Sequence, residues 1–198
     1  MTNGGRTMAT SQPGARKLQI LQSLAMMLEN PKGEKITTAA LAAKTQVSEA
    51  ALYRHFASKA QMYEGLLDFI ESSIFGLINQ ICAQQEDGIM QVAEMTRMLL
   101  SFAEQNPGMT RVLIGDALVN EDERLQARMN QLTERIELAY KQALRQALVQ
   151  GHFQEDETIY RAALFSSCVM GRWHRFVKSG FKYAPTQQSE ALIQIMLR

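Results

Sequence analysis

The chain has 198 residues, of which 46% are hydrophobic and 21% charged, and its formal net charge is +1. This composition is typical of a globular protein that buries a core, and it excludes wholesale disorder as well as collagen-like or low-complexity character. Cys82 and Cys168 are the two cysteines, too few for a disulfide scaffold or a four-cysteine metal site.

The first third of the chain is predicted to hold three helices behind an irregular start. Residues 1–14 are rich in Gly, Thr and Ser without periodicity, and we expect a disordered arm there. Leucines recur at three-to-four spacing over residues 15–29, which predicts an amphipathic helix. Two short helices are expected at about residues 39–44 and 49–56, joined by a tight connection. Capping residues precede both short helices: Thr37 or Thr38, and Ser48.

A long helix follows the two short ones, and Ser58 is expected to cap it. The helix is expected to end near Gly88. Its apolar stripe consists of Met62, Leu66, Ile70, Ile74, Leu77 and Ile81. Further helices are predicted at about residues 89–105, 109–118, 125–151, 157–178 and after Pro185. Because no convincing strand pattern is present, the predicted class is all-α with about nine helices, a small N-terminal domain over residues 15–60 and a larger bundle over residues 61–198.

Residues 36–59 read ITTAALAAKTQVSEAALYRHFASK, a pattern typical of a helix-turn-helix. Their apolar side chains are expected to pack against the first helix: Ile36, Leu41, Val47, Leu52 and Phe56. The second short helix then presents its other face to solvent, with small side chains at its start that let it enter a DNA major groove about 12 Å wide. The bare pattern is equally common in helix pairs that only pack together.

DNA binding requires side chains for bases and side chains for phosphates. Base contacts are expected among the outward residues Ser48, Glu49, Ala50 and Arg54. Phosphate contacts are expected from the polar residues Thr37, Thr38, Tyr53, His55 and Lys59. Lys59 lies in the first turn of the long helix, where the helix dipole disfavours a cation, so a phosphate partner is favoured there.

The small net charge conceals an uneven distribution along the chain. Residues 1–60 hold eight basic and three acidic side chains, a net +5, whereas residues 61–198 carry a net −4. A cationic N-terminal third favours contact with a polyanion such as nucleic acid, although a local excess of this size also arises by chance.

Residues 47–59 resemble the signature of TetR-type regulators. The specific part is the Tyr-x-His-Phe-x-x-Lys spacing of Tyr53, His55, Phe56 and Lys59, where the second short helix meets the long helix. This resemblance implies a DNA-binding head, a helical body for dimerisation and ligand binding, and dimeric binding to palindromic operators.

Parts of the body resemble the nucleoid-occlusion branch of the same family: residues 104–111, 123–132, 134–137, 175–183 and 185–186. Proteins of that branch bind chromosomal sites and, when bound to DNA, block assembly of the tubulin-like division protein FtsZ over unsegregated DNA. The resemblance therefore implies association with the nucleoid. It also implies a partner groove between the fourth and fifth helices, formed by Phe69, Ile70, Leu77, Met98, Ser101, Gln105 and Asn106.

Leu77 and Gln105 stand where that branch usually has arginines. A partner tail with acidic groups would lose charge-assisted hydrogen bonds, each worth about 1.5–3 kcal/mol. Arg97, one turn before Ser101, is a candidate substitute.

The helix predicted at residues 157–178 is richer in apolar and small residues than one exposed face permits. We expect this helix and the last one to pack against a second subunit, in an isologous dimer through roughly residues 155–197. The candidate interface residues are Ile159, Ala163, Cys168, Met170 and Trp173. An internal core helix is the alternative.

No sequence feature indicates an enzyme, a metal site or a cofactor. Cys168 and His174 lie six residues apart and do not share a helix face, and there is no His-x-x-x-His pattern or glycine-rich phosphate loop.

No apolar run approaches the roughly 20 residues of a membrane span, and residues 1–17 lack a secretory apolar segment. We therefore expect no membrane span and a cytoplasmic location with reduced thiols.

Two other functions stay open. A repressor released by a small molecule would be favoured by a closed apolar pocket in the body. A helical enzyme would be favoured by a deep cleft that gathers His174 and carboxylates. A filled core with an open groove between the fourth and fifth helices would favour a protein partner.

Overall fold

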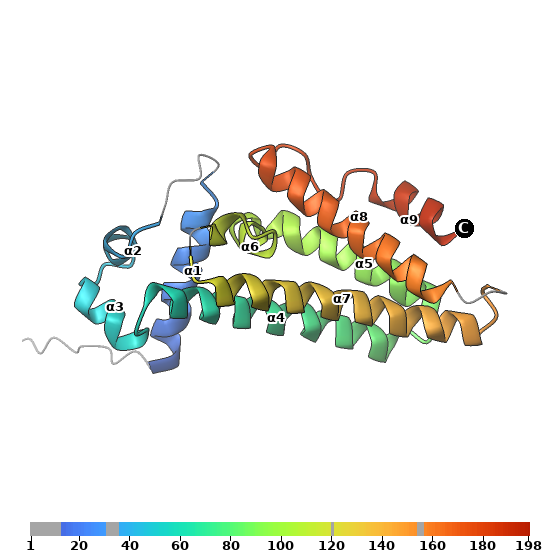
Figure 1. Ribbon diagram of the computed structural model, residues 1–198, viewed down its shortest axis with the longest axis horizontal. Coiled ribbons are helices and arrows are strands. Elements are labelled where there is room, and N and C mark those ends of the chain that lie inside the picture. Colours follow the sequence, from blue (N-terminus) through green and yellow to red (C-terminus); the bar gives the residue numbers. More distant parts are fainter. Residues whose placement is uncertain (1–12, 31–35, 120, 154–156) are drawn as a thin grey trace, which may run out of the picture.

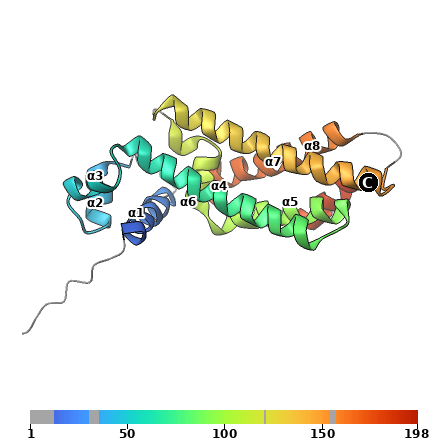
Figure 2. The same cartoon turned by 90° about the horizontal axis from the view of Figure 1, so that it is seen from below.

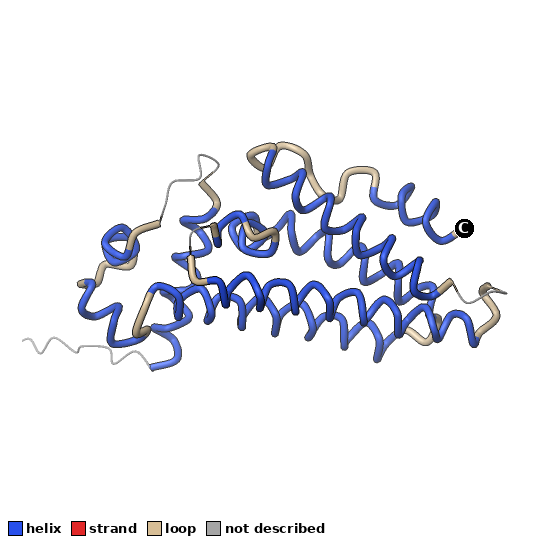
Figure 3. The backbone as a smooth tube through the Cα atoms, in the orientation of Figure 1, coloured by secondary structure: helices blue, strands red, loops and turns tan. Residues whose placement is uncertain are grey.

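The computed structural model describes residues 13–30, 36–119, 121–153 and 157–198, which form helices and the turns between them (Figures 1 and 3). Nine α-helices and one short 3₁₀ turn, η1, are described: α1 Pro13–Leu28, α2 Thr38–Lys44, α3 Glu49–His55, α4 Lys59–Gln84, α5 Gly88–Gln105, α6 Pro107–Leu113, η1 Asp116–Leu118, α7 Glu123–Val149, α8 Thr158–Lys178 and α9 Ser189–Leu197. These residues contain no strand, which confirms the all-α class and the predicted order of helices.

The molecule is elongated, with α1, α2 and α3 gathered at one end (Figures 1 and 2). We call α1 to α3, together with Lys59 at the first position of α4, the head, and the rest of α4 to α9 the body. α4 leaves the head and runs beside α7 along the body, α8 packs on α5 and α7, and α9 lies against α5 and α8. The head is therefore joined to the body directly through α4.

α1 begins earlier than the sequence pattern predicts. Pro13 and Gly14, which we assigned to the arm, belong to the helix. Proline is well suited to the first turn, because its missing N–H has no helical acceptor there and its φ is already helical. Residues 1–12, the rest of the expected arm, lie outside the described residues.

Side-chain caps start α2, α3 and α4 at the predicted positions. Thr37, Ser48 and Ser58 each accept a hydrogen bond from the backbone N–H three residues later, at 3.1 Å. Each bond satisfies a donor that has no partner within its own helix, which is worth about 1 kcal/mol. These caps therefore set where the short helices begin.

Apolar side chains from all three helices form the core of the head. Leu24 of α1, Leu41 of α2 and Leu52 of α3 are at most 2% exposed. Ile36 and Phe56 are buried as predicted, and Val47 packs on this core while partly exposed.

Two glycines shape the segment around α6. A Cβ at Gly108 of α6 would lie 1.9 Å from the carbonyl oxygen of Ala25 in α1, so only glycine permits this approach. Gly115 has φ +76°, a conformation that other residues rarely adopt, and it ends the helix that we predicted over residues 109–118. The segment is therefore split into α6 and η1.

The centre of the body is filled by large side chains. Tyr140 Oη lies 2.9 Å from Thr96 Oγ1, and the Tyr140 ring stacks on Phe165 at 5.6 Å between centroids. Trp173 Nε1 donates a hydrogen bond to the carbonyl oxygen of Leu99 at 3.1 Å, and the indole is 1% exposed. Trp173, which we expected at a dimer interface, is therefore a core residue of its own subunit.

One described helix, α4, reaches the length and hydropathy of a membrane-spanning helix. A single helix of this kind is a weak argument for a membrane, because helices in the cores of other proteins meet the same criterion. Leu66, Leu67 and Ile70 of α4 pack inside the molecule. The absence of a membrane span stays a prediction.

Candidate nucleic-acid interface

The outer face of α3 collects most of the side chains predicted to contact DNA. Leu52 is fully buried beneath the helix, whereas the outward residues are exposed: Ser48, Glu49, Ala50, Tyr53 and Arg54. His55, at the last turn, is half-buried. The helix therefore offers a polar face whose N-terminal end is free of bulky side chains.

The first turns of α2 and α3 are joined by a side-chain hydrogen bond. Thr38 Oγ1 donates to Glu49 Oε2 at 2.7 Å, so the hydroxyl of Thr38 is already used. Thr37 Oγ1 only accepts a bond in its capping role, which leaves its O–H free to donate to a phosphate oxygen. Thr37 is therefore the better candidate for a phosphate contact of the two.

Two cations of α1 lie beside the helix pair, and sequence reasoning did not single them out. Arg16 Nη2 donates to the carbonyl oxygen of Thr45 at 3.3 Å, next to the turn between α2 and α3. Lys17 Nζ lies 5.6 Å from the centroid of the Phe56 ring, at the end of α3. Their positive charge was visible in the sequence, but their proximity to the motif depends on how α1 crosses it.

Lys59 lies close to the predicted threonine ligands. It borders a small recess with Thr37 and Thr38, whose apolar wall comes from Leu24, Ile36, Leu41 and Met62. A phosphate that reaches this edge of the head would meet one hydroxyl donor and one ammonium. The structure thus brings together residues that the sequence places 22 positions apart.

The ammonium of Lys59 already has an anionic partner. Its Nζ lies 2.5 Å from Glu121 Oε1, and the two side chains are 21% and 13% exposed. It also lies 5.6 Å from the centroid of the Tyr63 ring. Burial and the negative charge of Glu121 raise the pKa of Tyr63 to about 12. The sequence does not reveal Glu121 as a partner, because it lies 62 positions from Lys59.

A second candidate surface is an open groove between α4 and α5, with a volume of about 410 Å³. Its lining residues are Leu77, Gln80, Ile81, Gln84, Glu94, Arg97, Met98 and Ser101. Of the residues predicted for a partner groove, Leu77, Met98 and Ser101 lie in this lining. Phe69 and Gln105 are exposed outside it, and Asn106 is half-buried at the end of α5.

Ile70 does not belong to any such surface, since it is fully buried. The buried positions of α4 keep a spacing of four residues, through Ile70 and Ile74 to Ile78. Leu77, which we placed in that stripe, falls beside it and is 39% exposed. Ile70 is therefore not part of the predicted groove, and Leu77 belongs to the groove and not to the buried stripe of α4.

Arg97, the candidate substitute for the missing arginines, is held by α9. Its Nε and Nη2 lie 2.7 and 2.9 Å from the two carboxylate oxygens of Glu190. The hydrogen bonds from Arg97 hold the pKa of the exposed Glu190 below its usual value. In this conformation the groove therefore presents a cation whose charge is largely compensated.

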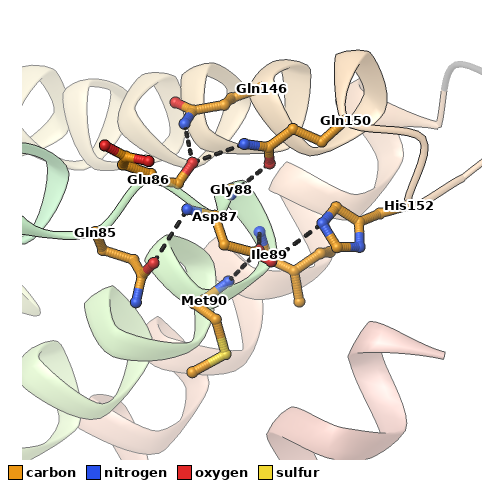
Figure 4. A network of polar contacts seen from close by, with 9 residues as sticks. All are labelled: Gln85, Glu86, Asp87, Gly88, Ile89, Met90, Gln146, Gln150 and His152. Atoms are coloured by element: carbon orange, nitrogen blue, oxygen red, sulfur yellow. Dashed lines mark hydrogen bonds and ion pairs between the residues drawn. The ribbon is translucent and has the colours of Figure 1, made fainter.

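The far end of the groove is tied to α7 by a polar network (Figure 4). Asp87 caps α5 by accepting bonds from Ile89 N at 2.8 Å and Met90 N at 3.0 Å. Gln150 accepts from Gly88 N at 2.8 Å and donates to the carbonyl oxygen of Glu86 at 2.7 Å. His152 Nε2 lies 3.2 Å from Asp87 Oδ2. The turn between α4 and α5 is thus fixed in position against α7.

At the opposite end of the body, Arg111 joins the body to the head, and two further polar groups of the body hold it in place. Arg111 Nη1 donates to the carbonyl oxygens of Leu28 and Asn30 in the head, at 3.1 and 3.3 Å. Its Nε donates to Asp116 Oδ2 at 2.9 Å, and Lys178 pairs with the same carboxylate. Burial alone would raise the pKa of Asp116, but hydrogen bonds from Lys178 and Arg111 bring it below the usual value.

α8 exposes an apolar face that no other part of the described chain covers. Ile159, Tyr160, Leu164 and Met170 are 62, 78, 49 and 38% exposed. A Cβ at Gly171 would meet nothing within 4 Å, so this face has room for a closely packed helix. Ala163 and Cys168 flank it and are half-buried.

Within the described residues, no group of three or more His, Cys, Asp or Glu side chains is placed to hold a metal ion. Cys168 has a pKa raised by burial, which leaves its thiol protonated at neutral pH. The Cys168 thiol is therefore not activated as a nucleophile.

Comparison with known proteins gives consistent results for the two parts of the chain. Residues 32–66 match the family of bacterial regulatory proteins of the tetR type, and residues 86–198 match the SlmA-like family described as the tetracyclin repressor-like C-terminal domain. "Nucleoid occlusion factor SlmA" of Aliivibrio fischeri is 51% identical over 183 residues, 91% of this chain and 93% of that protein. The protein of the same name from Vibrio cholerae is 50% identical, covering 90% of this chain and 92% of its own.

Solved structures share the fold at lower sequence identity. The MbdR regulator from Azoarcus sp. CIB superposes with a TM-score of 0.77 at 16% identity, covering 92% of this chain and 97% of its own. The regulator FadR from Bacillus subtilis, solved in complex with stearoyl-CoA, gives 0.74 at 12% identity, covering 91% and 97%. These likenesses support a shared architecture of head and body.

Proposed function

This chain belongs to the SlmA family of nucleoid occlusion factors, within the TetR-type regulators, and we propose that it binds palindromic chromosomal sites as a dimer and inhibits assembly of FtsZ over the nucleoid. The observation that carries the proposal is the similarity to curated nucleoid occlusion factors over nine-tenths of the chain. Such a protein acts in the cytoplasm, in association with the nucleoid.

The head supplies the DNA contacts in this proposal. The exposed start of α3, with Ser48 and Ala50, enters the major groove, and Arg54 follows along the same face. Thr37, Tyr53, His55 and Lys59 would bind flanking phosphates. In a symmetric dimer the two copies of α3 would contact half-sites about one helical turn apart, or a multiple of that distance.

The exposed face of α8 supplies the dimer contacts. Four large apolar side chains and a glycine on one helix are more than a lone subunit usually leaves in water. An isologous interface pairs this patch with itself, so one apolar face is enough for closure. Ile159, Ala163, Cys168 and Met170 remain the proposed contacts, and the exposed side chains of Tyr160 and Leu164 are added to them.

The groove between α4 and α5 is the proposed site for FtsZ. It is open, and Leu77, Met98 and Ile81 give it an apolar floor. Because Leu77 and Gln105 replace arginines, Arg97 is the cation available to an acidic partner, and binding would require it to exchange Glu190 for the partner's carboxylate.

The test is sedimentation of FtsZ polymers with this protein, in the presence and absence of a duplex that the protein has selected from a random pool. We expect less polymer in the pellet, and a larger decrease when the selected duplex is present. Unchanged pellets in both conditions would remove nucleoid occlusion and leave DNA binding alone.

The alternative is a conventional repressor released by a small molecule. Such a ligand would need space in the body of this chain. Tyr140, Phe165 and Trp173 occupy the centre of the bundle, which speaks for the partner-protein proposal.

A further inference from the structure

We infer that Glu121 competes with a DNA phosphate for Lys59, so that the body lowers the DNA affinity of the head in the unbound protein. The inference rests on the DNA binding proposed above, and it concerns how strongly the head binds rather than whether it binds.

The geometry places the two functions of Lys59 in conflict. Lys59 borders the recess that contains Thr37, at the edge of the head where a phosphate would lie. Its Nζ is nevertheless 2.5 Å from Glu121 Oε1. A phosphate oxygen in contact with Nζ would come within about 5 Å of the Glu121 carboxylate, and two anions at that separation repel each other.

Burial strengthens the competition. The Lys59 and Glu121 side chains are 21% and 13% exposed, so water screens their attraction less than it would on an open surface. The carboxylate and the ammonium largely cancel each other's charge. A phosphate therefore gains the full attraction of Lys59 only when Glu121 moves away.

Glu121 is held on the body, not on the head. Its backbone N–H donates to the carbonyl oxygen of Leu118 in η1, at 3.0 Å. The following residue, Asp122, caps α7 by accepting a bond from Arg124 N at 3.0 Å. The ion pair therefore ties the start of α7 to the start of α4, and a phosphate that takes Lys59 releases this tie. DNA binding would then loosen the start of α7, where it meets the start of α4.

The experiment measures the affinity for a fluorescent duplex that carries the sequence selected by the wild-type protein, over a series of KCl concentrations. Glu121→Gln removes the competing charge at nearly constant volume, and we expect it to bind about fivefold more tightly at equal salt. In a Lys59→Gln background the same change should alter affinity less than twofold, because the pair no longer exists. Glu123→Gln is the matched control, since it removes one exposed carboxylate two positions away; we expect less than a twofold effect.

A loss of affinity in Glu121→Gln would overturn the inference, because it would mean that Glu121 orients Lys59 for the phosphate. An equal gain in both backgrounds would also overturn it, since that gain would come from long-range charge. Glu121→Asp, which keeps the charge and shortens its reach, should give about a twofold gain and guards against misfolding of the first variant. If the wild-type protein binds no duplex, the proposed function itself fails. If the wild-type protein binds, but the effects of the Glu121 and Lys59 substitutions on affinity simply add, only this inference fails.

Hydrogen exchange supplies a readout that does not depend on affinity. In the wild-type protein, the selected duplex should increase amide exchange in the first turn of α7, around Glu123 and Leu125. Unchanged or slower exchange there would show that the pair stays closed on DNA and would contradict the inference.

Discussion

The outer faces of α3 and α8 are both exposed helix surfaces, but they differ in almost every physical property. α3 turns a hydroxyl, a carboxylate and a guanidinium toward solvent, in Ser48, Glu49 and Arg54. α8 turns Tyr160, Leu164 and Gly171 outward instead. Water solvates the first face well, whereas covering the second gains about 25 cal/mol for each Å² of apolar surface. This difference in polarity is what separates the surface proposed for DNA from the surface proposed for a second copy of the chain.

The largest expected effect comes from making the α8 face resemble the α3 face. Leu164→Asp would place an unpaired carboxylate in each half of the dimer interface, which costs several kcal/mol. We expect monomers in sedimentation velocity and a loss of DNA affinity of about 100-fold or more. Leu138→Asp is the control, because Leu138 on α7 is 48% exposed against 49% for Leu164. A dimer that survives Leu164→Asp alone would move the interface elsewhere.

The next largest effect is expected when a positive charge is removed from the proposed DNA surface. Lys59→Ala should weaken binding to all duplex sequences by about tenfold and lower the slope of log affinity against log salt by about one. Lys141→Ala, which removes a lysine from α7, should change neither quantity. An unaltered slope in Lys59→Ala would show that Lys59 does not contact a phosphate.

The groove between α4 and α5 is intermediate between the two faces, since it is apolar with one compensated cation. Leu77→Arg would restore the charge usual at this position in the nucleoid-occlusion branch, and we expect roughly fivefold less protein to be needed for half-maximal inhibition of FtsZ pelleting. Leu138→Arg adds the same charge on α7 and should have no effect. Equal potency of Leu77→Arg and wild type would argue against an acidic FtsZ segment in this groove.

The smallest effect concerns the link between head and body. Because hydrogen bonds hold the pKa of Asp116 below its unfolded value of about 3.9, this carboxylate stabilises the fold above that pH and stops doing so as pH falls through the lower folded value. Asp116→Asn should therefore reduce the free energy of unfolding by about 1 kcal/mol at pH 7, with the difference shrinking below about pH 4.

Urea denaturation at both pH values and equal protein concentration measures this difference. Asp68→Asn, in a more exposed pair with Arg128, is the comparison and should change stability less. A stability difference between Asp116→Asn and wild type that grows toward low pH would mean that folding raises the pKa of Asp116 instead of lowering it.

Local chemistry made the order of helices and the capping residues predictable. Thr37, Ser48 and Ser58 each act within three residues of their own position, so the sequence near them contains all the required information. The same holds for the outward residues of α3, because Leu52 and Phe56 indicate the inward face of a short helix.

Contacts between distant segments were not predictable in the same way. Ile70 and Trp173 are apolar residues on apolar helix faces, and periodicity does not reveal whether such a face meets its own subunit or a partner. Lys59 and Glu121 are 62 positions apart and meet only because α7 returns along α4. Gly115 ends a helix because its φ is positive, and the residue type alone does not show that this glycine adopts such a conformation.

The close approach of Gly108 to Ala25 affects how the head is oriented on the body, and so would affect the spacing of the two copies of α3 in a dimer. α6 rests directly on the backbone of α1, so any side chain at position 108 would act as a wedge and tilt the head against the body. In a symmetric dimer each wedge would shift its own copy of α3, and the preferred separation of half-sites would change by twice that shift. If the protein binds DNA as proposed, the glycine at position 108 would therefore help to set the spacing of half-sites that the dimer accepts.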